Sequence, residues 1–85
     1  MYQIIVSDKA KKQLEKLSSD IRDRIGFALE RIRIRPHHFV LRLTGSPYYR
    51  LRIGDYRVIL DILNDKLIIM VIELGHRKNI YDGLS

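Results

Sequence analysis

The stretch YYRLRIGDYRVILDILNDKLIIMVIEL, residues 48–74, decides the fold. It contains runs rich in β-branched and aromatic residues at positions 48–53, 56–63 and 67–74. The dipeptides between these runs, Gly54-Asp55 and Asn64-Asp65, are both suited to two-residue hairpin loops. The stretch therefore predicts three antiparallel strands that form a β-meander.

The residues before this stretch predict a strand and two helices. A short β-branched segment at 2–7 indicates a strand. Ala10, Leu14 and Leu17 then recur at helical spacing behind Ser7 or Asp8 as the cap.

A longer second helix is predicted from the break at Ser18-Ser19-Asp20 to Arg35, before Pro36. One apolar face runs along it, made of Ile21, Ile25, Ala28, Leu29 and Ile32. We therefore predict an α+β fold: an N-terminal strand, a helical hairpin packed on one sheet face, and then the antiparallel β-meander.

Composition restricts the class of protein. The 85 residues suffice for a single domain spanning 1–85, with 46% hydrophobic and 31% charged residues, a balance typical of a folded chain. The formal net charge of +6 favours an anionic partner, nucleic acid first.

Several chemistries are not expected. The chain has no cysteine, which excludes disulfides, thiolate zinc sites and a thiol nucleophile and favours the cytoplasm. We expect no signal peptide, and the apolar run at 67–72 is far too short to span a membrane. The three histidines form no convincing metal constellation, so we expect neither a metal nor a cofactor.

The first predicted hairpin concentrates positive charge. With Gly54-Asp55 as the loop, Arg52 lies opposite Arg57, and Arg50 shares their face because side chains alternate along a strand. Opposed like charges repel, so the arrangement makes sense if an anion lies between them. The alternative is a solvated arginine face, partly neutralised by Asp61.

The segment after the third strand can extend this face. Gly75 is expected to release the chain, so that His76, Arg77 and Tyr81 turn back towards the arginines. Guanidinium groups bind phosphates and an aromatic ring stacks on an unpaired base, a combination that suits RNA. His76 is equally compatible with a loop histidine that has no role.

Phe27 and Ile34 form a second apolar stripe on the longer helix. Two interpretations are open. The stripe packs on the first helix or a loop, or it binds a partner.

Together these residues resemble a known family. The segments YRLRIGDYRVI at 49–59 and LGHR at 74–77, followed by Tyr81, are similar to those of the RelE/ParE superfamily of type II toxins, and the similarity covers nearly the whole chain. The resemblance implies a microbial RNase-like fold and, for the RelE branch, cleavage of messenger RNA in the ribosomal A site. It also implies a cognate RelB-like antitoxin as partner, for which Phe27 and Ile34 are the candidate contacts.

The resemblance assigns roles to the arginine face. Arg50 and Arg52 occupy positions where RelE toxins have lysines, one of them often taken as the general base. Arg57 matches the arginine that stabilises the transition state, Arg77 the C-terminal arginine, and Tyr81 the tyrosine that stacks on the substrate. The RNA-binding residues are then Arg50, Arg52, Arg57, Arg77 and Lys78.

The arginines leave the general base unassigned. A guanidinium is a poor proton acceptor near neutral pH, whereas an imidazole such as His76 has an unperturbed pKa near 6.5. His76 is therefore a candidate, unless it points to the opposite face from Arg77.

The sequence thus favours a ribosome-dependent, metal-independent endoribonuclease that inhibits translation by cleaving mRNA. Two alternatives remain, a ParE-like inhibitor of DNA gyrase and a non-catalytic nucleic-acid-binding module.

Overall fold

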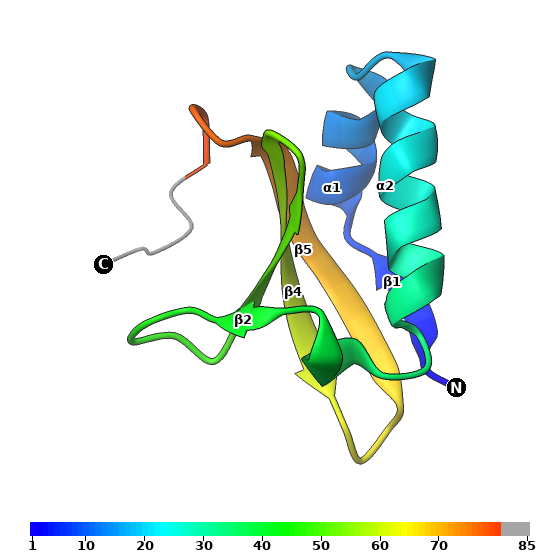
Figure 1. Ribbon diagram of the computed structural model, residues 1–85, viewed down its shortest axis with the longest axis vertical. Helices are drawn as coiled ribbons and strands as arrows, with labels where there is room; N and C mark the ends of the chain where they lie inside the picture. The colour runs from blue at the N-terminus through cyan, green and yellow to red at the C-terminus, as the bar shows by residue number, and fades with distance from the viewer. Residues whose placement is uncertain (81–85) are drawn as a thin grey trace.

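The protein forms a five-stranded sheet with two helices on one face, as the computed structural model shows for residues 1–80 (Figure 1). The strands lie in the order β1-β5-β4-β3-β2. The elements are β1 (Gln3–Val6), α1 (Asp8–Glu15), α2 (Ser19–Ile32), a short 3₁₀ helix (Pro36–His38), β2 (Leu41–Arg42), β3 (Tyr49–Ile53), β4 (Tyr56–Leu63) and β5 (Ile68–His76). The predicted α+β class and the order of elements are confirmed.

The helices form where the sequence predicts them, because each begins at a serine cap. The Ser7 hydroxyl accepts a hydrogen bond from the Ala10 amide, and Ser18 does the same for Ile21. α2 is shorter than expected, since it ends at Ile32 and not at Arg35.

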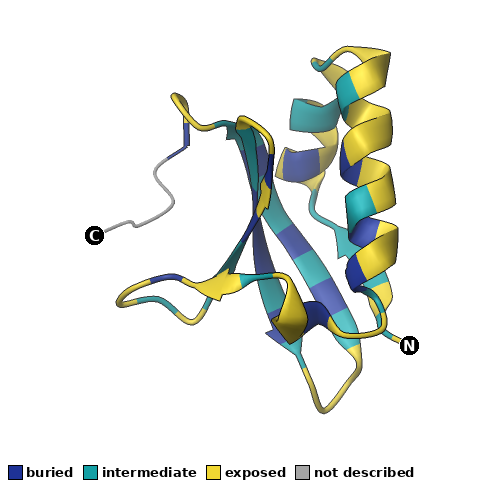
Figure 2. Cartoon of the chain, viewed as in Figure 1, coloured by how far each residue is buried: buried dark blue, intermediate teal, exposed yellow. Residues whose placement is uncertain are grey.

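The core lies between this helical pair and the sheet (Figure 2). Helix α2 contributes Ile25, Leu29 and Ile32, and the facing strand residues include Val58 and Leu60, both fully buried. The predicted apolar face of α2 is therefore the face that packs on the sheet.

The sheet is mixed, because β1 pairs in parallel with β5. Beyond β1, α1 covers the remaining edge of β5 with polar side chains: the Ser7 hydroxyl donates to the Ile72 carbonyl at 2.7 Å, and the Gln13 amide oxygen accepts from the Leu74 amide at 2.8 Å. These contacts lie at a β-bulge, where Ile59 pairs with Glu73 but Leu60 pairs with Val71.

The first hairpin has the predicted register, with Ile53 paired to Tyr56 and Arg52 to Arg57. Gly54 has a φ of 58°, and a glycine at the first loop position is what a type II′ hairpin turn requires.

The second hairpin differs from the prediction. Leu63 pairs with Ile68, so the loop has four residues, and Asn64-Asp65 alone does not form it. Leu67 adopts a φ of 54°, and its carbonyl accepts a hydrogen bond from the Gln3 amide at 2.8 Å. Leu67, which the sequence pattern assigned to the third strand, therefore lies in the loop and bonds to β1 through its carbonyl.

Strand β5 also continues further than predicted. Gly75 does not release the chain, because it pairs with Arg57 inside the strand. Buried Ile80 packs against Gly75, where a Cβ would meet its side chain at 3.5 Å, an ordinary van der Waals contact.

Candidate functional site

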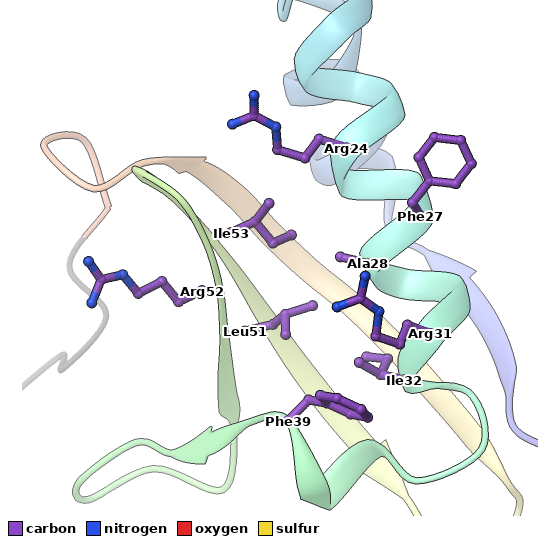
Figure 3. A pocket seen from close by; sticks show the side chains of 9 residues that line it. All are labelled: Arg24, Phe27, Ala28, Arg31, Ile32, Phe39, Leu51, Arg52 and Ile53. Atoms are coloured by element: carbon purple, nitrogen blue, oxygen red, sulfur yellow. The ribbon is translucent and has the colours of Figure 1, made fainter.

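The arginines of β3 and β4 lie on the sheet face that the helices leave uncovered. Leu51 and Ile53 point towards α2 and are buried, whereas Arg52 between them points the other way (Figure 3). Arg52 pairs with Arg57 across the hairpin, and Arg50 pairs with Ile59, the next residue of β4 on the same face.

Arg77 joins these three arginines from the turn after β5. Its amide donates to the Asp55 carbonyl at 2.8 Å, and its Nε lies 3.9 Å from Asp55 Oδ1. The C-terminal turn is thereby attached to the first hairpin loop, next to the strand ends that carry Arg52 and Arg57. We call the four residues Arg50, Arg52, Arg57 and Arg77 the arginine site.

The electrostatics of Arg57 reflect the three other charges of the site. Desolvation, followed by the positive charges of Arg50, Arg52 and Arg77, lowers the pKa of the Arg57 guanidinium below its ordinary value. The guanidinium remains protonated at neutral pH, so the site concentrates positive charge and hydrogen-bond donors. Such a site suits a phosphate group, which accepts bidentate hydrogen bonds and neutralises the repulsion.

His76 lies apart from the arginine site. It pairs with Tyr56, and their rings meet edge to face with centroids 5.4 Å apart. Because Gly75 shares the face of Arg57, the next residue along β5 lies on the opposite face. Its Nδ1 accepts a hydrogen bond from the Lys78 amide at 3.2 Å, so the imidazole is engaged locally.

The other predicted site residues have different outcomes. Lys78 is exposed in the turn after β5, beside Arg77. Tyr81 lies outside the described residues. Within residues 1–80, no three His, Asp or Glu side chains come together as ligands for a metal ion.

A groove between α2 and β3 contains one of the two predicted partner contacts (Figure 3). Its volume is about 490 Å³, and it is lined by Arg24, Phe27, Ala28, Arg31, Ile32, Phe39, Leu51, Arg52 and Ile53. Phe27 is 73% exposed, so it does not pack on α1 or a loop.

Ile34 is also exposed but lies elsewhere, in a shallow hollow with the 3₁₀ helix. Because α2 ends at Ile32, Phe27 and Ile34 do not form one helical stripe.

The sequence analysis did not identify the arginines of this groove. Arg24 and Arg31 are seven residues apart on α2, on the side that carries Phe27, and this spacing is the signal that would have revealed them. Their charges border an apolar floor. Arg52 also lines the groove from β3, but its side chain points away from α2 (Figure 3).

Comparison with known proteins identifies the class to which this fold and site belong. A family profile, "ParE toxin of type II toxin-antitoxin system, parDE", matches residues 4–81, so the chain belongs to this toxin family within the RelE/ParE superfamily. Among curated proteins, no sequence matches significantly.

The solved structures that resemble this chain are RelE toxins. A chain of the intact E. coli RelBE toxin–antitoxin complex superposes with a TM-score of 0.76 at 26% identity, covering 89% of this chain and 96% of that one. A chain of the archaeal RelE–RelB complex from Pyrococcus horikoshii superposes with a TM-score of 0.78 at 26% identity, covering 93% of this chain and 98% of that one. A chain of the RelBE2 complex from Mycobacterium tuberculosis superposes with a TM-score of 0.79 at 23% identity, covering 89% of this chain and 98% of that one, and shows the shared fold.

Within residues 1–80, no helix is long and apolar enough to cross a membrane.

Proposed function

We propose that this RelE-like toxin is a ribosome-dependent endoribonuclease that cleaves messenger RNA in the ribosomal A site without a metal ion. The observation that carries the proposal is the convergence of four guanidinium groups on one open sheet face, with Arg52 directly opposite Arg57. Two opposed cations are unfavourable alone, but they match the charge of a phosphate whose negative charge grows in the transition state.

The proposed chemistry uses the RNA itself as nucleophile. The 2′-hydroxyl attacks the adjacent phosphorus, and the arginine site stabilises the crowded phosphate. Cleavage leaves a 2′,3′-cyclic or 3′-phosphate end and a 5′-hydroxyl end. Tyr81 is proposed to stack on a base of the substrate, and Lys78 to contact the RNA backbone. The ribosome and mRNA place this activity in the cytoplasm.

A second candidate is inhibition of DNA gyrase, which the ParE description of the matching family favours. Primer extension on translated message with purified ribosomes, run in parallel with a gyrase supercoiling assay, separates the two functions. Cuts in the message with intact gyrase activity support the proposal. Gyrase inhibition without cuts supports the ParE function. If the protein neither cuts the message nor inhibits gyrase, the remaining interpretation is a non-catalytic binding module.

We also propose that the cognate antitoxin occupies the groove between α2 and β3. The groove combines an apolar floor with a rim of Arg24 and Arg31, so it fits an amphipathic segment that carries acidic side chains.

A further inference from the structure

The arginine site lacks a proton acceptor among its own four side chains. Attack by the 2′-hydroxyl requires that its proton be removed, and efficient enzymes supply a positioned base for this step. A guanidinium only donates hydrogen bonds at neutral pH. The base must therefore come from a neighbouring residue.

Among residues 1–80 we consider four neighbouring groups, and three of them are poorly placed or already engaged. His76 lies on the opposite face and bonds to the Lys78 amide. Glu73 lies opposite Ile59 on the arginine face, but its carboxylate pairs with Lys9 of α1 at 3.0 Å. Asp61 lies on the same face near Arg50, but it is four residues along β4 from Arg57, which corresponds to about 13 Å.

Asp55 is the carboxylate that the structure attaches to the site. It lies in the loop between Arg52 and Arg57, two residues from the latter, and its Oδ1 is 3.9 Å from Arg77 Nε. Its side chain is 64% exposed, so an RNA bound over the arginines can reach it. A carboxylate oxygen can accept a proton, whereas a guanidinium only donates hydrogen bonds.

We propose that Asp55 is the general base of the cleavage reaction, with Arg77 orienting its carboxylate. This inference rests on the proposed function. The carboxylate takes the proton of the 2′-hydroxyl while the 2′-oxygen bonds to phosphorus and the bond from phosphorus to the 5′-oxygen breaks. The departing 5′-oxygen takes a proton from water, and the proton held by Asp55 returns to solvent.

The attachment of the C-terminal turn allows a clean substitution. The hydrogen bond from the Arg77 amide ends on the backbone carbonyl of Asp55, so it survives changes of the side chain. Asp55→Asn keeps the size of the side chain, and asparagine is well tolerated in turns. The variant removes the proton acceptor together with the negative charge beside Arg77.

The test is single-turnover cleavage on programmed ribosomes over a pH series. We expect Asp55→Asn to lose at least about 100-fold in the rate of the chemical step, with ribosome binding unchanged and the acid limb of the pH profile gone. Asp55→Glu should restore part of the rate. Asp65→Asn is the matched control, because it removes the same charge from an exposed position in the other hairpin loop and should cleave normally.

Other results would overturn the inference. A near-normal rate in Asp55→Asn, combined with a loss in Asp55→Ala, would show that the residue only positions Arg77. A selective loss in Asp61→Asn would transfer the role of base to that residue. If Arg57→Ala abolishes cleavage while Asp55→Asn does not, the assignment of Asp55 as general base is wrong and the endoribonuclease function stands. If the unaltered protein cuts no message, the proposed function itself is wrong.

Discussion

The exposed ring of Phe27 provides a quantitative test of the groove. Complete burial of a phenylalanine side chain contributes about 1.5–3 kcal/mol, and Phe27 is 73% exposed in the free protein. Covering it with a partner is therefore worth about 1–2 kcal/mol. Because 1.4 kcal/mol is a tenfold change in affinity, we expect Phe27→Ser to weaken antitoxin binding by roughly 5- to 30-fold.

The change should appear in the dissociation rate, where most differences between variants of one interface arise. Stopped-flow displacement of labelled antitoxin measures it directly. The free energy of unfolding, measured with urea, should be nearly unchanged because the ring is already exposed in the free protein.

Ile34→Ser is the matched control. It removes a side chain of similar exposure, 67%, from a position outside the groove. We expect dissociation from this variant to be normal. Unchanged dissociation in a folded Phe27→Ser protein, or a loss only in Ile34→Ser, would refute the assignment of the groove.

Three further predictions concern the arginine site and its inhibition. Arg57→Ala should abolish RNA cleavage while the melting temperature stays equal or rises slightly, because repulsion with Arg52 is removed; a large loss of thermal stability would show that the arginine is structural. Tyr81→Phe should lose less cleavage than Tyr81→Ala, since base stacking is worth roughly 1–3 kcal/mol and does not need the hydroxyl; equal losses in single-turnover rates would point to the phenol group. Antitoxin association should slow as salt rises, because screening limits charge interactions to about 8 Å at physiological ionic strength, and a salt-independent rate in stopped-flow mixing would remove the steering argument.

The arginine pairing was predictable because it depends only on local rules. A two-residue loop at Gly54-Asp55 fixes which residues face each other, and alternation fixes the shared face of Arg50 and Arg52. The same alternation explains why His76 is excluded once Gly75 is known to pair with Arg57. That pairing was missed because a glycine inside a strand pattern was interpreted as the end of the strand.

The features that escaped prediction depend on contacts between distant segments. The parallel pairing of β1 with β5 changes the loop at Leu67, and no pattern within that loop indicates it. The groove likewise needs α2 and β3 to meet, although each contributes an ordinary amphipathic pattern. Periodicity identifies the face that each element buries, but not which exposed residues become neighbours.

The pairing of the first strand with the last also determines when this protein can fold during synthesis. The Ser7 hydroxyl and the Ile72 carbonyl are 65 residues apart in the chain, and β5 supplies the buried Ile69, Val71 and Leu74. Contacts so far apart in sequence slow folding, because a long loop must close before they form. A nascent chain that has not yet released β5 from the ribosome therefore has two helices and a hairpin but no closed core. The arginine site gains its fourth member, Arg77, only after the whole of β5 has been synthesised.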